Sequence, residues 1–220
     1  MMVDRHGNLT PAPLDFLNQE QCRVSSISPQ SPEHFVESIR PDGTGLFVSF
    51  VHTNDRYGHV IALVQGDDII PMFVSIEGNS EEDWPESPPL QEIHIEPRRE
   101  QSVALLVGKA GDSHWSVAVE PAAAGGTLTF AVACRMRDYP RQICSRYGSV
   151  LEEPIEPVLE RDGPWVFPIQ GAEVCVDVIP QEEYPTPEVP ASRTGFEVNA
   201  SLDHEPFPKT IQWRYKVWVR

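Results

Sequence analysis

Apolar and polar side chains alternate with a period of two along much of this chain, and this alternation constrains the fold more than any other feature. The clearest stretch is 211–219, whose apolar residues of one phase are Ile211, Trp213, Tyr215, Val217 and Val219. This periodicity is typical of a strand that buries one face and exposes the other. We therefore expect these five side chains to line a core, and Trp218, which has the opposite phase, to point outward.

Comparable apolar runs, separated by turn residues, indicate about a dozen short strands. Their spacing of roughly 8–12 residues is typical of β-sandwiches and barrels. The sequence therefore predicts an all-β fold, an antiparallel β-sandwich. The expected strands are 20–27, 45–52, 59–65, 69–76, 90–95, 101–107, 113–120, 127–136, 143–150, 165–169, 173–179, 195–201 and 211–219.

The pair 113–120 and 127–136 shows most clearly which side chains should face the core. One phase of the two runs is apolar and the other consists largely of small or basic residues. We expect the apolar phase to be buried, and the second face to be either open or closely packed by another element. The expected core residues are Trp115, Val117, Val119, Phe130, Val132, Cys134 and Met136.

One segment carries a helix signal instead. Ser31 is a candidate N-cap, and Pro32 suits the first helical position. Phe35, Val36 and Ile39 would share one helical face, and the Pro-Asp-Gly sequence at 41–43 would end it. We therefore predict one short connector helix of about two turns in addition to the strands.

The domain organisation follows from where strands are expected. Residues 1–19 are polar and contain prolines, which indicates a loose N-terminal arm. We expect residues 20–220 to form a single β-sandwich domain, because the strands continue without a long flexible linker. The alternative is two small β-domains that meet near 151–163, a stretch rich in proline and acidic residues.

Charge and apolar content restrict the partners and the compartment. The chain has 17 basic and 33 acidic side chains, a formal net charge of −16, so we expect it to bind neither nucleic acid nor an anionic membrane. No apolar run approaches the ~20 residues of a membrane helix, and no secretory signal is visible. The four cysteines lack C-x-x-C spacing and are interpreted as reduced thiols of a soluble cytoplasmic protein.

No familiar catalytic or cofactor motif occurs in the sequence: there is no nucleophile elbow, no Gly-rich phosphate loop and no H-E-x-x-H. We therefore predict no cofactor. His52 and His59, which flank a turn, are the candidate metal ligands. Two histidines fall short of the three or four ligands that zinc needs, so we expect no bound metal.

The most local anomaly is a basic stretch at 134–146, which holds four arginines and a single aspartate. Arg135 and Arg137 share a strand face, with Tyr139 nearby, and we expect Arg146 to lie across a hairpin from them. This set predicts a site for a small anion or a carboxylate. The alternative is that these arginines form ion pairs with the protein's own acidic residues.

Two tryptophans complete the candidate ligand-binding residues. Trp84 lies in the acidic, proline-rich loop 77–89, and Trp218 has the outward phase of the last strand. Aromatic side chains beside carboxylates are typical of faces that bind sugars or peptides. The alternative is that both rings cover the ends of the sandwich, since tryptophan is usually well buried.

These observations favour a non-catalytic binding or interaction module whose partner is a protein or a small molecule. Loops 77–89 and 180–190 would be presented from a rigid scaffold. The sequence singles out no catalytic residue. The alternative function is a carboxylate-dependent hydrolase acting on carbohydrate, which requires two carboxylates at a suitable separation in a cleft.

Overall fold

The computed structural model describes residues 33–98, 101–202 and 206–220. The chain divides into two compact units, Met1–Ser31 and Pro32–Arg220, and the described residues belong to the second. The expected arm 1–19 and the expected strand 20–27 lie outside the described residues. So do Ser31 and Pro32, which carried part of the helix signal.

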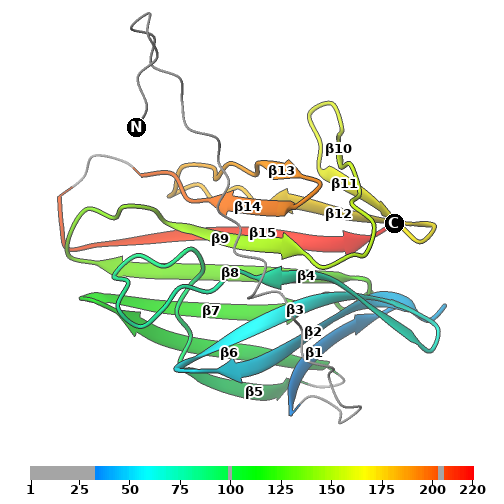
Figure 1. Cartoon of the computed structure of the whole chain (residues 1–220), viewed down its shortest axis with the longest axis horizontal. Helices are drawn as coiled ribbons and strands as arrows, with labels where there is room; N and C mark the ends of the chain where they lie inside the picture. The colour runs from blue at the N-terminus through cyan, green and yellow to red at the C-terminus, as the bar shows by residue number, and fades with distance from the viewer. Residues whose placement is uncertain (1–32, 99–100, 203–205) are drawn as a thin grey trace, which may run out of the picture. The chain divides into compact units, whose positions relative to one another are not determined.

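The described residues form two large antiparallel sheets packed together, which is the predicted β-sandwich (Figure 1). The seven-stranded sheet has the order β1 (His34–Ile39), β2 (Thr44–Thr53), β3 (Arg56–Gln65), β4 (Asp68–Ser75), β9 (Cys144–Ser149), β14 (Gly195–Asn199), β13 (Ala191–Ser192). The eight-stranded sheet has the order β10 (Val158–Leu159), β11 (Trp165–Ile169), β12 (Ala172–Val178), β15 (Lys209–Val219), β8 (Thr127–Met136), β7 (Ser113–Pro121), β6 (Gln101–Ala110), β5 (Glu92–Arg98).

The core lies between the inner faces of the two sheets, and the alternation of side chains predicted it correctly. All five expected core residues of β15 are at most 3% exposed. The seven expected core residues of β7 and β8 are also buried. The opposite phase of β15 is half-buried and faces outward. Because the register pairs β15 with β8 along its whole length, the outward side chains of the two strands form one continuous face.

The predicted connector helix is wrong. The segment around Phe35, Val36 and Ile39 forms β1, which pairs with β2 over six residues. Val36 and Ser38 face the core, whereas Phe35 and Ile39 face outward. An isolated two-turn helix is marginal on its own, since nucleation costs more than so few hydrogen bonds return. A six-residue ladder along an existing sheet satisfies the same backbone groups and buries Val36 completely.

Residues 151–163 lie between strands of the same sheet. β8 precedes this stretch, β12 and β15 follow it, and all three are neighbours in the eight-stranded sheet. We predict that limited proteolysis leaves one stable fragment spanning 151–163, because separating its two sides would break the ladder that β15 forms with β8 and the ladder that β14 forms with β9. Rapid cleavage in this stretch into two separately folded fragments, detected by mass spectrometry, would instead support two domains.

Within the described ranges there is no helix that is long and apolar enough to cross a bilayer. Three cysteines lie in these ranges, Cys134, Cys144 and Cys175, and all are buried free thiols. Burial raises the pKa of Cys134 and of Cys144 to about 12. These thiols therefore have little thiolate character at neutral pH.

Candidate anion-binding site

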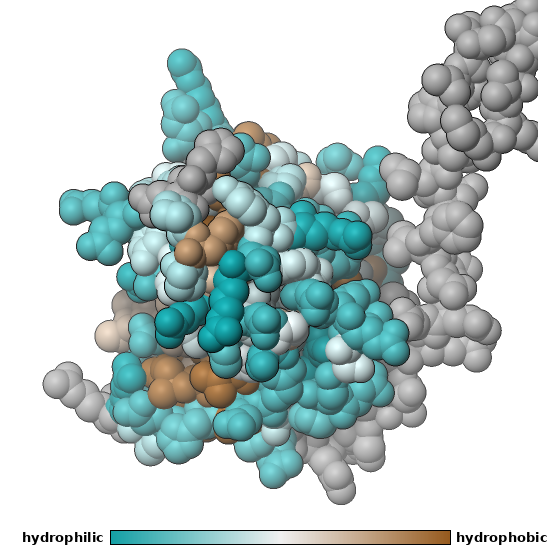
Figure 2. Space-filling view, turned by 90° about the vertical axis from the view of Figure 1, so that its left-hand side faces the viewer, coloured by the Kyte–Doolittle hydropathy of each residue, from teal (hydrophilic) through white to brown (hydrophobic). Residues whose placement is uncertain are grey.

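The pair Arg135 and Arg137 lies where β8 ends, on the outer side of the eight-stranded sheet. Cys134 and Met136 of the same strand point into the core, so alternation directs the two arginines outward, and both are exposed. The register places His114 of β7 directly beside Arg135. Figure 2 views the end of the unit at which β8 ends and β15 begins, on the left of Figure 1, and hydrophilic residues predominate there.

Two adjoining hollows share these arginines. One, of about 240 Å³, is lined by Arg135 and Arg137 together with Asp112 and His114. The other, of about 310 Å³, is lined by the same two arginines together with Phe207 and Pro208. We call the residues that line the two hollows the arginine pocket. It combines charged donors with an aromatic and a proline side chain, which suits a ligand that has an anionic group and an apolar body.

Tyr139 lies beside the arginine pocket. Its ring meets that of Phe207 edge to face, with the centroids 4.6 Å apart. Tyr139 remains 64% exposed, so much of this residue is accessible to a ligand. The structure therefore places Tyr139 near Arg135 and Arg137 through a residue almost seventy positions further along the chain.

Several arginines of this region differ from the other described arginines in that their guanidinium groups have no partner at all within the described residues. Within the part of the chain that the structure describes, four guanidinium groups have neither an ion pair nor a hydrogen bond: those of Arg135, Arg137, Arg141 and Arg214. All four lie on β8, in the loop that follows it, or on β15. In a chain of net charge −16, most basic side chains are expected to find an acidic partner. The guanidinium groups that have none keep their hydrogen-bond donors free for an external anion.

Arg146 behaves differently from the pair. It lies on β9, which pairs with β4 and β14 in the seven-stranded sheet and not with β8. Its guanidinium forms ion pairs with Glu86 at 2.6 Å and with Glu197 at 2.7 Å. The expected hairpin between Arg146 and the other arginines is therefore wrong, and the internal pairing weighed as the alternative describes Arg146 but not Arg135 and Arg137.

Neither candidate tryptophan lies in the arginine pocket. Trp84 is half-buried and packs edge to face on the core residue Trp115, with the centroids 6.5 Å apart. Trp218 faces outward on the same sheet as Arg135, but eight residues along β15 from Thr210, the register partner of Arg135. The ammonium group of Lys216 lies 4.5 Å from the centroid of the Trp218 ring, so one face of that ring is already occupied.

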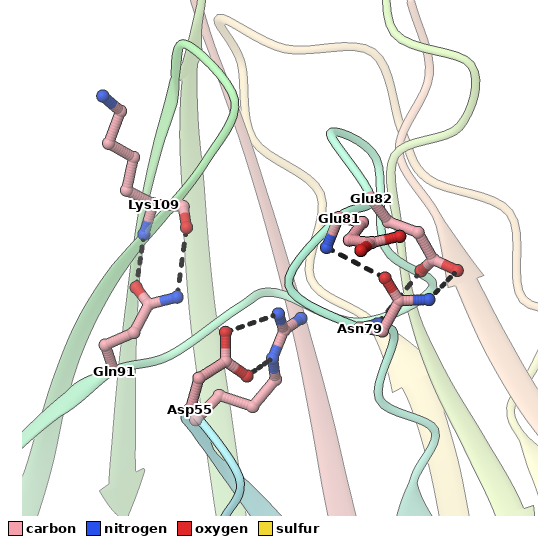
Figure 3. Close-up of polar contacts among 7 residues, drawn as sticks. Asp55, Asn79, Glu81, Glu82, Gln91 and Lys109 are labelled. Atoms are coloured by element: carbon pink, nitrogen blue, oxygen red, sulfur yellow. Dashed lines mark hydrogen bonds and ion pairs between the residues drawn. The ribbon is translucent and has the colours of Figure 1, made fainter.

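Loop 77–89 packs against the sandwich instead of standing free. Its last residues, from Ser87 onward, are buried, and the Ser87 hydroxyl donates to the carbonyl of Arg146. Figure 3 shows that the exposed turn of the loop is closed on itself, with the Asn79 side chain bonded to Glu81 and Glu82. Such a loop is a fixed part of the scaffold and offers few free donors to a ligand.

Just beyond the loop, Gln91 ties the chain to the hairpin that leads into the arginine pocket. Its side-chain amide exchanges two hydrogen bonds with the backbone of Lys109, as Figure 3 shows. Lys109 is the register partner of His114. The strand end that carries His114 therefore lies between β8 and the end of β6, which Gln91 holds in place.

The two candidate metal-ligating histidines are not partners. The register pairs His52 with Tyr57 and His59 with Phe50. His52 is exposed, whereas His59 is buried, with Nε2 2.7 Å from the Tyr147 hydroxyl. Burial lowers the pKa of His59 to about 4. No group of three or more His, Cys, Asp or Glu side chains suited to a metal ion occurs in the described ranges.

Sequence reasoning missed several polar and aromatic residues. The arginine pocket also contains Asp112, His114, Phe207 and Pro208, none of which carries a motif. The core contains a polar chain in which the Tyr147 hydroxyl lies 2.6 Å from that of Tyr215. The outward phase of His114 was the only signal in the sequence, because the turn 122–126 does not fix the register in which β7 pairs with β8.

No protein-family model matches this chain, and no curated protein or solved structure is significantly similar to it.

Proposed function

We propose that this protein is a non-catalytic binding module that holds a carboxylate or phosphate group of a protein or small-molecule partner in the arginine pocket. The observation that carries this proposal is the pair of adjacent guanidinium groups, Arg135 and Arg137, that have no acidic partner within the described residues of a chain with net charge −16. Arginine presents a planar fork of donors that matches both anions in a bidentate manner.

The surroundings of the arginine pocket support recognition of more than a bare ion. Phe207 and Pro208 line one hollow beside the two arginines, and Tyr139 extends this apolar wall to the surface. A ligand with an apolar body next to its anionic group would bury surface there, and such burial contributes about 25 cal/mol per Å². The proposal includes a cytoplasmic location, which the buried free thiols support.

The alternative function, a carboxylate-dependent hydrolase acting on carbohydrate, has one supporting observation. Burial raises the pKa of Glu77 to about 7, whereas the hydrogen bond from Arg56 lowers the pKa of Asp55. Acid and base pairs with opposite shifts occur in glycosidases. Glu77 Oε2 is buried, however, and Oε1 accepts a hydrogen bond from Ser75, so a substrate oxygen has no access to this carboxyl group.

The proposal is tested by titrating the protein with inorganic phosphate and with the blocked dipeptide acetyl-Glu-Glu-amide. We expect the Nε–H resonances of Arg135 and Arg137 to shift on titration. We expect Arg135→Ala combined with Arg137→Ala to weaken binding about tenfold or more, since each charge-assisted hydrogen bond contributes about 1.5–3 kcal/mol.

The matched control combines Arg161→Ala with Arg193→Ala. Both are exposed arginines that pair with Asp162 and Glu156 away from the arginine pocket, so this variant loses the same charge without touching the site. Equal affinities of the two double variants would show that binding reflects overall charge, and the proposed function would then be wrong.

A further inference from the structure

The arginine pocket opens onto the outer face of the eight-stranded sheet, and the middle of that face is smooth. Ser116 and Ala118 of β7 lie beside Ala133 and Ala131 of β8, and Thr129 follows. These small side chains form a strip along two neighbouring strands, between longer side chains, and we call this strip the track. Leu105 of β6 stands on one side, where it pairs with Ala118. β15 forms the other side.

Cations continue along the β15 side of this track. Arg214 pairs in the register with Ala131, and Lys216 pairs with Thr129. Both are half-buried, and neither has an ion pair within the described residues. The Nε of Arg214 is buried and has no hydrogen-bond partner there. Because this nitrogen is buried, a ligand would reach Arg214 only at the rest of its guanidinium group.

The spacing of the cations fits an extended chain. Arg135 pairs with Thr210, so Arg214 and Lys216 lie four and six residues further along β15. At about 3.4 Å per residue these offsets are roughly 14 and 20 Å. In an extended ligand every second side chain points to the same face. Acidic residues at positions i, i+4 and i+6 of such a ligand would therefore reach the three cations, and one at i−2 would reach Arg137.

The same face argues against a continuous polyanion and against a sugar chain. Glu120 and Asp177 lie in the same cross-strand row as Lys216, so a phosphate on every unit of a nucleic acid would meet like charges there. The ring of Trp218, which would offer a sugar a stacking surface, is already covered by Lys216. A peptide with spaced acidic residues places a single carboxylate in this row, opposite Lys216, and does not need the Trp218 ring as a stacking surface.

We infer that the partner is an extended acidic peptide that lies along β8 and β15, from the arginine pocket toward Trp218. This inference rests on the proposed function, because Arg137 and Arg135 hold the first two carboxylates. The small side chains of β7 and β8 provide the floor on which the peptide backbone lies. Arg214 and Lys216 set the spacing of the remaining acidic residues.

The test uses two blocked nine-residue peptides of identical composition on an otherwise serine and alanine background. One has glutamate at positions 1, 3, 7 and 9, which matches the cation spacing. The isomer has glutamate at 1, 3, 6 and 8, so that its last two carboxylates point away from the sheet. We expect the matched peptide to bind about tenfold more tightly by calorimetry, since it forms two ion pairs that the isomer cannot form.

Variants separate this inference from the proposed function. We expect Arg214→Gln with Lys216→Gln to reduce the affinity of the matched peptide to that of the isomer, while the isomer's own affinity stays unchanged and shows that the variant is folded. Equal binding of both peptides to the native protein, with loss only in the Arg135→Ala, Arg137→Ala variant, would overturn the peptide track and leave the proposed function standing. Binding that survives this last variant would overturn both.

Discussion

Replacing Trp213 by alanine is expected to lower the free energy of unfolding by about 3–5 kcal/mol, the usual cost of removing a large aromatic side chain from a core. The ring is 1% exposed. It packs edge to face on Trp115, with the centroids 6.2 Å apart, and its Nε1 donates to the Ser145 hydroxyl at 3.2 Å. Single domains are commonly stable by only about 5–15 kcal/mol, so this variant should be close to unfolding.

Trp218→Ala is the matched control, because it changes the same residue type on the opposite face of the same strand. Trp218 is half-buried and packs under Lys216, so we expect a much smaller loss. The two urea midpoints, measured against the native protein, give the comparison. Equal losses would mean that a further layer covers the outer face of β15, and this result would also remove the space in which we place the acidic peptide.

The sequence predicted the strands well because alternation is a local property of the chain. Each residue of β15 has its phase fixed by its own neighbours, and the burial of Trp213 and the outward position of Trp218 follow from that phase alone. The same reasoning succeeded for β7 and β8. It did not require knowing which strands are neighbours in a sheet.

Predictions that depended on long-range pairing succeeded less often. Phe35, Val36 and Ile39 are compatible with one face of a helix, and only the ladder with β2, which is formed by later residues, makes this segment a strand. Arg146 was grouped with Arg135 from closeness in sequence, but the chain crosses to the other sheet between them. Most successive strands of this fold are neighbours within one sheet, but β9 lies in the other sheet from β8, so closeness in sequence misled at this connection.

In the candidate site, too, the sequence predicted the residues with a local signal and missed those that only tertiary structure brings there. The unusual density of arginine identified Arg135 and Arg137, and the alternation placed them outward. Phe207 contributes to the same site from just before the last strand, and nothing in its local sequence indicates this. Which acidic residue each arginine pairs with also depends on tertiary structure. Composition alone therefore could not predict that Arg146 forms internal ion pairs whereas Arg137 forms none within the described residues.

A second large effect is expected from two buried titratable groups whose contributions to stability oppose each other. His59 packs against Phe130 and Tyr147, and burial lowers its pKa from 6.5 to about 4. Glu77 lies near Gly58, where an added Cβ would be 3.5 Å from the Glu77 Cγ. Burial raises the pKa of Glu77 from 4.5 to about 7. Each shift corresponds to about 3 kcal/mol at 1.36 kcal/mol per pKa unit.

The signs of the two contributions follow from which state binds the proton. Between pH 6.5 and 4 the unfolded chain protonates His59 while the folded protein does not, so this group destabilises the fold as the pH falls. Between pH 4.5 and 7 the folded protein keeps the Glu77 proton while the unfolded chain loses it, so this group destabilises the fold as the pH rises. Between pH 4.5 and 6.5 the two contributions change the free energy of unfolding in opposite directions as the pH changes, and they therefore cancel.

Glu77→Gln should remove the pH dependence that Glu77 contributes to the free energy of unfolding. The opposite pH dependence, which His59 contributes, then becomes visible. The glutamine still accepts the hydrogen bond that the Ser75 hydroxyl donates to Glu77, but it does not titrate. We expect the free energy of unfolding of this variant, relative to the native protein, to rise by about 3 kcal/mol as the pH rises from 4.5 to 7. Urea denaturation at pH 4.5, 5.5, 6.5 and 7 measures this difference, and subtracting the native curve removes the contribution of every other titrating group.

His59→Gln is the complementary variant. Its free energy of unfolding, relative to the native protein, should fall by about 3 kcal/mol as the pH rises from 4 to 6.5, because the opposing contribution of His59 is gone. Variant curves that run parallel to the native curve would mean that Glu77 and His59 titrate as they do in water. The carboxyl group of Glu77 would then be accessible to solvent, and burial would no longer keep a substrate away from it.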